Sequence, residues 1–432
     1  MTSANVPVVT AEASPARISS GGEVVDVLVI GAGPAGLSAA RELSRQGVGS
    51  VLVVDREKTP GGIPRHSDHT GYGLRDVHRV MRGPAYAHLL AERAQHSGAH
   101  ILCSTMVTGW VGERSVRVTS PQGTRTIDAR VVLLATGARE RPRAARLVPG
   151  DRPAGVLTTG QLQSMVHLHH QRVGERAVIV GSELVSWSAV LTLREAGCRT
   201  VLMTSTHPRL ESPWAFTVPG RLALGVPVAR STQVTGVLGD GRVRGVEIQH
   251  LATGQRRTIA CDTVVFTGDW IPDNELARSA GLAMDPATGG PVVDAGLRTS
   301  ADSIFAAGNL VHPVDTADVA ALDGIHAAHR ILAFLDGSTP GATAVRIHAQ
   351  SPLAWITPGI LRVDDPIPAR RRLLAWPETF IARPTIVVHQ SDRVIARRRL
   401  LWPAALGRIL RIPSSVLDNV HPQGGDVSIG IN

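Results

Sequence analysis

The chain has few cysteines, few aromatic residues and no long apolar run. Its 432 residues include three cysteines, Cys103, Cys198 and Cys261, which lie far apart and form no Cys-x-x-Cys pair. Iron–sulfur clusters and zinc sites use more closely spaced cysteines, so we expect no bound metal and reduced thiols in a cytoplasmic protein. No apolar run reaches the roughly 18 residues of a membrane span. The first 23 residues lack the basic start and apolar block of a secretory signal, and we expect a disordered extension there.

Lysine is almost absent, since Lys58 is the only one and arginine supplies nearly all of the positive charge. The net charge is +9, and eleven arginines lie between residues 362 and 411 beside only four acidic residues. Nucleic-acid-binding surfaces interleave basic with aromatic residues, whereas aromatic residues make up only 3% of this chain. We therefore expect this segment to form a solvated or partner-facing surface, with no nucleic-acid partner.

The most informative stretch is residues 26–55, DVLVIGAGPAGLSAARELSRQGVGSVLVVD. An apolar strand runs into Gly31, Gly33 and Gly36, which have G-x-G-x-x-G spacing, and a helical pattern follows. In such a unit the first glycine permits a tight turn, the second lets the backbone approach a pyrophosphate, and the third lets the helix pack against the strand. A second apolar strand ends at Asp55, an acid placed to bind a ribose hydroxyl. The unit predicts a dinucleotide-binding site.

The loop that follows Asp55 is rich in glycine and carries two histidines, His66 and His69. Glycine lets a backbone lie against a flat cofactor, because it has no side chain to hold the cofactor away. An amphipathic helix is expected at 84–97. Alternating strands then lead to an apolar strand that ends in the segment Ala135-Thr136-Gly137.

These motifs, together with a late IFAAGN segment at 304–309, resemble the two-dinucleotide-binding-domain flavoproteins of the pyridine nucleotide-disulfide oxidoreductase superfamily. The thioredoxin-reductase-like branch is the most similar, over about residues 24–335. The resemblance implies an α/β fold with two Rossmann-like, three-layer ββα domains, the second inserted in the first. We expect the FAD domain at 24–148 and 266–336 and the inserted NAD(P)-binding-like domain at 149–265.

The remaining segment, 337–432, is rich in proline, arginine and tryptophan. We expect it to form a small C-terminal α+β domain. Strands are predicted at 385–388 and 394–397, and a helix near 404–410.

The resemblance also implies which residues hold FAD. Asn309 stands where relatives have an aspartate that bonds the ribitol, and it can accept the same hydrogen bond. A helix expected to begin near Asp315 or Thr316 would point its N-terminus at the isoalloxazine. The full set of expected FAD-binding residues is Gly31, Gly33, Pro34, Ala35, Gly36, Asp55, Arg56, Gly62, Ile63, Val107, Ala135, Thr136, Gly137, Gly308, Asn309, Asp315, Thr316 and Ala317.

Two departures from the superfamily change the expected chemistry. The second glycine turn reads Gly181-Ser182-Glu183, so a carboxylate stands where a pyrophosphate needs close approach, and NAD(P)H binding is doubtful. The redox dithiol is also missing, because no two cysteines of the chain are neighbours. Disulfide exchange needs two neighbouring sulfurs, so we do not expect that chemistry. A flavin that accepts a hydride is what remains.

The motifs GGIPRH, ATGARERPR and GVLTTGQLQ resemble FAD subunits associated with glycerol-3-phosphate-dehydrogenase-like proteins, opine oxidase and the hydrogen cyanide synthase α subunit. This similarity implies an FAD-dependent dehydrogenase subunit that takes a hydride from a small amine, amino acid or alcohol and passes electrons to a partner or another acceptor. The partner would be a second oxidoreductase subunit, or the chain would form a homodimer. The alternatives are an NAD(P)H-dependent flavin reductase and a non-catalytic FAD-containing assembly subunit.

Histidines near the flavin are the candidate catalytic groups, because imidazole can take the proton released as hydride leaves. His66, His69 and His312 are these candidates, and for His66 and His69 the alternative is a surface loop position. Asp315 or Asp318 is expected to cap the late helix rather than act as an acid.

Overall fold

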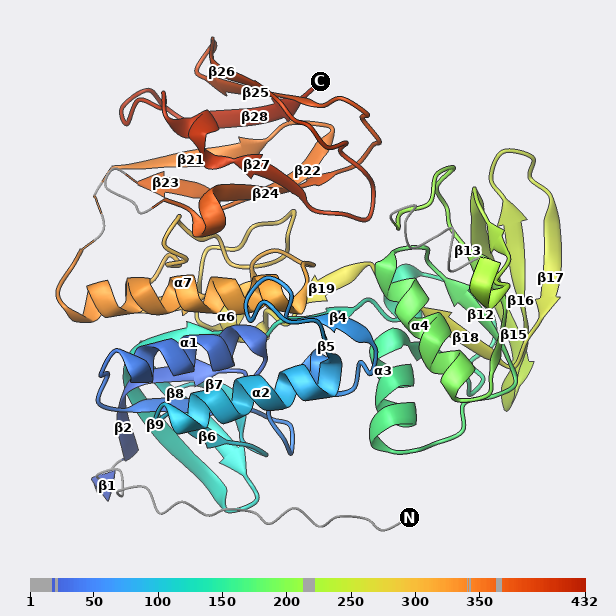
Figure 1. The fold of residues 1–432 in the computed structure, drawn as a ribbon, viewed down its shortest axis with the longest axis horizontal. Coiled ribbons are helices and arrows are strands. Elements are labelled where there is room, and N and C mark those ends of the chain that lie inside the picture. Colours follow the sequence, from blue (N-terminus) through green and yellow to red (C-terminus); the bar gives the residue numbers. More distant parts are fainter. Residues whose placement is uncertain (1–17, 20–21, 213–221, 340, 342, 363–366) are drawn as a thin grey trace.

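The computed structural model describes residues 18–19, 22–212, 222–339, 341, 343–362 and 367–432 (Figure 1). The first Rossmann-like unit is built on a parallel sheet in the order β6-β3-β2-β9-β20. Its central strands are apolar and buried over 27–30, 51–54 and 131–134, as expected for strand segments that are covered on both faces. The strands are β2 (Gly22–Ile30), β3 (Val51–Val54), β6 (His100–Leu102), β9 (Gly123–Leu134) and β20 (Ile304–Ala306).

Helices pack on one face of this sheet, and an antiparallel meander extends β9 (Figure 1). Helix α1 contacts both α2 and α7. The helices are α1 (Pro34–Arg45), α2 (Gly83–His96) and α7 (Ala317–Leu335), and the meander adds β7 (Met106–Trp110) and β8 (Ser115–Ser120). Short elements complete the unit: β1 (Ile18–Ser19), η1 (Ile63–Arg65), β4 (Thr70–Tyr72), β5 (Met81–Arg82), α6 (Glu275–Ser279) and η4 (Gly308–Leu310).

The second Rossmann-like unit has a five-stranded parallel sheet in the order β11-β18-β12-β13-β14 and a three-stranded antiparallel sheet, β15-β16-β17. Two antiparallel strands, β10 (Ala138–Glu140) and β19 (Trp270–Pro272), pair where the chain leaves the first unit and returns to it. The strands are β11 (Val156–Thr158), β12 (Arg176–Val180), β13 (Arg199–Thr204), β14 (Val228–Ala229), β15 (Thr232–Asp240), β16 (Arg242–His250), β17 (Arg256–Ala260) and β18 (Thr263–Phe266). The helical elements are η2 (Arg143–Arg146), α3 (Thr159–Gln163), the π-helix η3 (Ser164–Leu168) and α4 (Leu184–Glu195).

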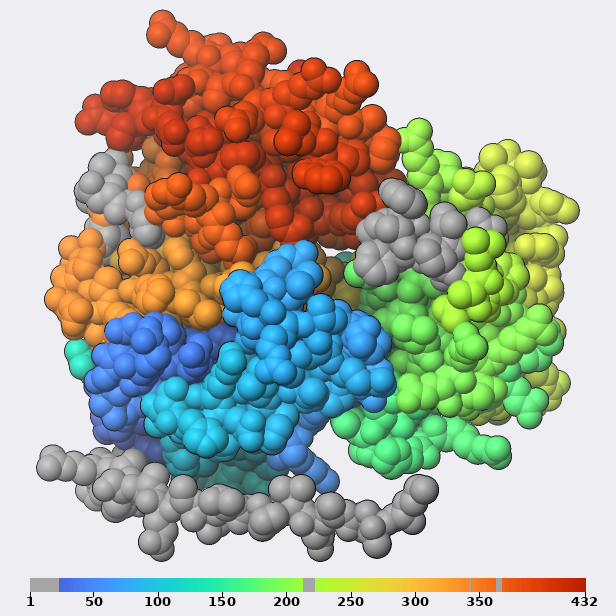
Figure 2. All heavy atoms as spheres, viewed as in Figure 1, coloured from blue at the N-terminus to red at the C-terminus, as the bar shows by residue number. Residues whose placement is uncertain are grey.

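The segment after α7 folds into two sheets around its own apolar core. One sheet has the order β23-β21-β28-β25-β26 and the other β22-β24-β27. The strands are β21 (Ala344–Ala349), β22 (Leu353–Thr357), β23 (Ile360–Arg362), β24 (Arg372–Pro377), β25 (Thr385–Gln390), β26 (Arg393–Arg399), β27 (Leu410–Pro413) and β28 (Val427–Ile431). Figure 2 shows this C-terminal domain, in red, lying across the α7 side of the first unit.

The predicted fold class of two Rossmann-like units is confirmed, and so are the strands expected at 385–388 and 394–397. The helix expected near 404–410 is wrong. Pro403 precedes this segment, Ala404 pairs its backbone with Ile381, and Gly407 adopts φ +68°, so the chain forms a loop that leads into β27. The described C-terminal domain is therefore a β domain, with only the short turns η5 (Ala369–Arg371) and η6 (Ser414–Leu417), and is not α+β. Within the described ranges, no helix is long and apolar enough to cross a membrane.

Candidate functional site

The first glycine turn connects β2 to α1, and its three glycines have three different environments. A Cβ on Gly31, at φ +109°, would lie 2.4 Å from the carbonyl oxygen of Ala135. A Cβ on Gly36 would lie 1.9 Å from the carbonyl oxygen of Gly31, so α1 packs directly on the turn. Around Gly33, by contrast, no atom of the described chain lies within 4 Å of the Cβ position. The first and third glycines are required by packing, and the second faces open space at the start of a helix, where N–H groups can bind an anion.

Two distant glycines approach this same turn. A Cβ on Gly62 would lie 3.0 Å from Gly33 Cα, and a Cβ on Gly308 would lie 3.0 Å from Ala35 Cβ. The glycine-rich loop after β3 and the segment after β20 therefore meet at the N-terminus of α1. These residues fit the diphosphate of a dinucleotide, because backbone without side chains lines the approach to free N–H groups.

Asp55, at the end of β3, already accepts two backbone hydrogen bonds. Ala32 N donates to Asp55 Oδ2 at 2.6 Å, and Glu57 N donates to Oδ1 at 2.8 Å. The carboxylate thus holds the turn in place while it remains partly exposed. Thr136 Oγ1 donates to the carbonyl oxygen of Asp273, and Arg56 pairs with the Asp273 carboxylate at 3.1 Å. Sequence reasoning missed Asp273, which connects the segment after β9 to the segment after β19.

The N-terminus of α7 is closed by side chains from two other parts of the chain. Thr316 is the N-cap residue, and Asp318, which is buried, accepts hydrogen bonds from Arg75 N and Arg75 Nη1, both at 3.1 Å from Oδ2. Asp315 accepts from Arg411 Nη2 of the C-terminal domain at 2.6 Å. Neither aspartate occupies the N-cap position itself. The helix begins at Ala317, one or two residues later than predicted. The ion pair of Asp315 with Arg411 connects the C-terminal domain to the start of this helix.

Asn309 lies in η4, where its amide spans the loop before α7. Its Nδ2 donates to the carbonyl oxygen of Asp315 at 3.1 Å, and its Oδ1 accepts from Asp315 N at 3.0 Å. The neighbouring candidates Val107 and Ala135 are buried, and Ile63 is exposed on η1.

The three candidate histidines lie in different environments. His66 is buried, and its Nδ1 has no hydrogen-bond partner in the described part of the chain. Burial, followed by the nearby charge of Arg65, lowers the pKa of His66 to about 4, so its imidazole is neutral at pH 7. His69 Nδ1 lies 2.8 Å from the carbonyl oxygen of Thr70 and must donate to it, which leaves Nε2 to accept from Ser67 Oγ at 3.0 Å. Both ring nitrogens of His69 are therefore engaged, whereas Nδ1 of His66 has no partner among the described residues.

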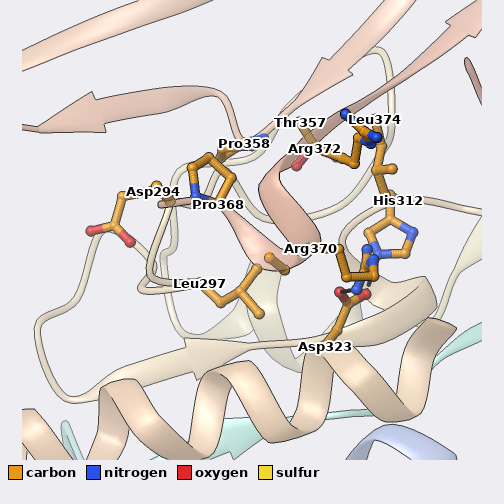
Figure 3. A pocket seen from close by; sticks show the side chains of 12 residues that line it. Asp294, Leu297, His312, Asp323, Thr357, Pro358, Pro368, Arg370, Arg372 and Leu374 are labelled. Atoms are coloured by element: carbon orange, nitrogen blue, oxygen red, sulfur yellow. Dashed lines mark hydrogen bonds and ion pairs between the residues drawn. The ribbon is translucent and has the colours of Figure 1, made fainter. Parts of the chain in front are cut away.

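His312 faces the C-terminal domain. Its Nε2 lies 2.6 Å from Asp323 Oδ2, and Arg370 also pairs with Asp323 (Figure 3). These side chains line a cavity of about 20 Å³, which is room for one water molecule. His312, Asp323 and Arg370 thus form a buried polar cluster between α7 and the C-terminal domain, which we call the domain joint.

A buried amide that the sequence did not identify lies beside His66. Gln163, at the end of α3, donates from Nε2 to Ser188 Oγ at 2.7 Å and to Ser67 Oγ at 3.2 Å. The sequence motif GVLTTGQLQ, at residues 155–163, contributed to the family resemblance. It could not show that Gln163 contacts the loop that carries His66, because that contact forms only in the folded chain. The histidine loop of the first unit is thereby joined to α3 of the second.

The second glycine turn, between β12 and α4, is filled by the side chains of two glutamates. Glu183 accepts from Ser186 Oγ at 3.0 Å and from Thr267 Oγ1 at 3.2 Å. Ser182 is fully buried and donates from Oγ to Glu211 Oε2 at 2.7 Å. Burial, followed by the charge of Glu211, raises the pKa of Glu183 to about 8.

A loop of the C-terminal domain packs over these two glutamates. Arg408 Nε donates to the carbonyl oxygen of Glu211 at 3.1 Å, and a Cβ on Gly407 would lie only 2.6 Å from Glu211 Cβ and 3.4 Å from Glu183 Cγ. Where the first turn is open above Gly33, the second turn is thus covered by Glu183, Glu211 and the Gly407 loop. The sequence indicated Glu183 but gave no signal for Glu211 or Gly407, which meet it only in the folded chain.

The family model described as pyridine nucleotide-disulphide oxidoreductase matches residues 25–324. The chain belongs to this family. The match confirms the resemblance drawn from the sequence and identifies the protein as an oxidoreductase.

Several relatives support the assignment. Thioredoxin reductase of Treponema pallidum is 28% identical over 316 residues, which cover 72% of this chain and 97% of that protein. An opine oxidase subunit of Agrobacterium tumefaciens is 30% identical over 322 residues, which cover 66% of this chain and 61% of the relative. The crystal structure of T. acidophilum thioredoxin reductase has a TM-score of 0.61 at 24% identity, covering 73% of this chain and 99% of that one. The match with the opine oxidase protein thus spans about three fifths of that protein's length.

This member of the pyridine nucleotide-disulphide oxidoreductase family has no redox dithiol. Cys103, Cys198 and Cys261 are all free thiols, and Cys198 and Cys261 are buried. Burial raises the pKa of Cys198 to about 12 and that of Cys261 to about 11, so neither forms a reactive thiolate at neutral pH. The described residues also contain no cluster of side chains that could hold a metal ion.

Proposed function

We propose that the chain is an FAD-dependent dehydrogenase subunit that takes a hydride from a small amine, amino acid or alcohol. The observation that carries this proposal is the contrast between the two glycine turns. The first is open above Gly33, and the second is covered by Glu183, Glu211 and the loop at Gly407. An oxidoreductase of this family that keeps one dinucleotide and loses the other has a flavin but no nicotinamide donor.

FAD would be held by residues of 24–148 and 266–336, with the pyrophosphate at Gly33 and the start of α1. When bound, FAD supplies a hydride acceptor. The expected FAD-binding set, including Asn309 and Thr316, stays part of the proposal. We assign the inserted segment 149–265 to packing against the C-terminal domain, 337–432, rather than to nicotinamide binding.

His66 is the residue that we assign to proton transfer. Its neutral imidazole and partner-free Nδ1 can accept the proton of an amine or hydroxyl. Gln163 and Ser67 hold the loop that carries it. His69, whose two ring nitrogens are engaged with Ser67 and Thr70, is assigned to positioning. His312, whose Nε2 is held by Asp323 at the contact between α7 and the C-terminal domain, is assigned to the domain joint.

The substrate class follows the named relatives. They include the opine oxidase protein and the alpha chain of a Corynebacterium sarcosine oxidase, which is 31% identical over 182 residues, 40% of this chain and 18% of that protein. Both names indicate oxidation of substituted amino acids by enzymes built from more than one subunit. We extend that chemistry to this chain, and we propose that its partner is a second oxidoreductase subunit. The free cysteines fit a reducing compartment such as the cytoplasm.

Anaerobic stopped-flow reduction of the bound flavin tests the proposal. The purified protein is mixed with NADH, NADPH and a panel of N-substituted amino acids, amines and hydroxy acids. At least one donor of the panel should bleach the flavin, and the two nicotinamide nucleotides should not. Rapid bleaching by NADH or NADPH would instead support the flavin reductase alternative. No bleaching by any donor would support the alternative of a non-catalytic assembly subunit.

A further inference from the structure

A groove of about 840 Å³ runs across the C-terminal domain, between the end of β26 and the start of β27. Its walls come from three places: the turn before β24, the loop that follows β26, and β27 with η6. None of these segments belongs to the region that the family model matches, which ends at residue 324. The groove is therefore a feature of this chain's C-terminal domain.

The groove is strongly basic. Arg371, Arg372, Arg398, Arg399 and Arg411 line it, and Asp418 is the acidic residue among its lining side chains. Arg411 is paired with Asp315. The side chains of the other four arginines are exposed and make no ion pair or hydrogen bond with the described part of the chain. Four positive charges that have no partner among the described residues, gathered around one concave surface, attract a negatively charged partner.

Large apolar side chains stand beside these charges. Leu401 is 95% exposed and Trp402 is 80% exposed, in the loop directly after β26. Exposed Trp next to Arg is the composition of energetically important positions in protein interfaces. A small anion would neutralise the arginines but leave Leu401 and Trp402 in water, whereas a protein segment with its own apolar side chains would bury them.

The groove also adjoins the proposed flavin site. Arg411, on its wall, donates to Asp315, the residue before the N-cap of α7. A partner seated in the groove would therefore lie next to the helix end that the proposed function puts at the cofactor.

We propose that this groove docks an acidic segment of a second protein, the partner of the dehydrogenase. The four arginines Arg371, Arg372, Arg398 and Arg399 attract and orient the segment, and Leu401 and Trp402 anchor it. This inference rests on the proposed function only for the identity of the partner, because the charge and the exposed anchors are properties of the C-terminal domain itself.

The test is a binding titration with a synthetic probe. The probe is a peptide of about 12 residues in which Asp and Glu flank a central Leu-Phe pair, and the matched peptide has Asn and Gln in place of the acids. Arg398→Glu/Arg399→Glu is the groove variant. Arg256→Glu/Arg257→Glu is its matched control, because these exposed arginines are also adjacent, lie on β17, and have side chains without a described partner. Leu401→Ser/Trp402→Ala tests the anchors.

We expect the acidic peptide to bind the wild-type chain and the β17 control equally, and to bind the groove variant and the anchor variant at least about tenfold more weakly. Binding should weaken between about 50 and about 300 mM salt, because ions screen exposed charges. Equal binding of the amide peptide, or unchanged binding to the groove variant, would overturn the proposal. So would citrate or inorganic phosphate binding as tightly as the peptide, which would indicate a small-anion site.

FAD content is measured on every variant, and so is the rate at which the bound flavin is reduced by the donor of the anaerobic panel that bleaches the wild-type protein. Both should be the same in the groove variant as in the wild type. A wild-type chain that binds the peptide but holds no FAD would contradict the proposed function and leave the docking surface standing.

Discussion

Substituting alanine at two neighbouring glycines should separate cofactor binding from folding. Gly33 has φ −81° and ψ −177°, which alanine adopts readily, and no described atom lies within 4 Å of the added Cβ. Gly33→Ala should therefore stabilise the cofactor-free protein by about 0.5 kcal/mol, because alanine has less conformational freedom in the unfolded chain. The same methyl group would project into the space that we assign to the pyrophosphate.

The expected loss of FAD affinity follows from the hydrogen bonds that the methyl group prevents. A hydrogen bond to a charged group contributes about 1.5–3 kcal/mol. Losing one such bond at α1 weakens FAD binding roughly 10- to 100-fold. Gly36→Ala is different, because its Cβ would lie 1.9 Å from the carbonyl oxygen of Gly31, so α1 must move. We expect this overpacking to cost the apoprotein roughly 3 kcal/mol.

Two measurements on each variant decide the matter. Urea unfolding of the apoprotein, followed by circular dichroism, gives the free energy of unfolding, and quenching of flavin fluorescence gives the FAD dissociation constant. Gly33→Ala should mainly raise the FAD dissociation constant, and Gly36→Ala should mainly lower the free energy of unfolding. Wild-type FAD affinity in Gly33→Ala would refute the assignment of the pyrophosphate to this turn.

Three further predictions concern titratable groups. Between pH 4.5 and about 8, Glu183 is ionised in the unfolded chain but keeps its proton in the folded protein. The free energy of unfolding should therefore fall as pH rises through this window and level off above it. Glu183→Gln should flatten that dependence when urea unfolding is measured at a series of pH values. Asp323→Asn leaves Arg370 and His312 without their carboxylate, and we expect the free energy of unfolding to fall by about 3 kcal/mol. An unchanged free energy of unfolding would mean that the domain joint does not contribute to stability. His66→Gln should slow flavin reduction about 100-fold with normal FAD content, and His69→Gln much less; equal effects would remove His66 from proton transfer.

The parts of the fold that depend on neighbouring residues could be predicted from the sequence. The turn has a local signature, the G-x-G-x-x-G spacing, and Gly36 is required by a contact within it, with the carbonyl oxygen of Gly31. The contact that requires Gly31 is instead with Ala135, which is distant in the sequence and adjoins the turn only in the folded sheet. The helix expected at 84–97 also has a local signature, and it is α2, at Gly83–His96. Local patterns of apolar residues and glycine suffice there.

The helix expected near 404–410 fails because tertiary contacts outweigh local propensity. Alanine and leucine favour a helix, but Ala404 pairs with Ile381 across the domain, and Gly407 is held against Glu211 of the second unit. The closure of the second glycine turn could not be predicted for the same reason. The residues that cover Glu183 come from positions 211 and 407, and no pattern in the sequence connects them.

The central claim is that the chain binds one dinucleotide, FAD, at the first turn and none at the second. Calorimetric titration of the apoprotein with FAD, and of the FAD-loaded protein with NADH and NADPH, tests it most directly. We expect one FAD per chain and no saturable heat with either nicotinamide nucleotide. A second dinucleotide bound per chain, or an apoprotein that takes up no FAD, would contradict it.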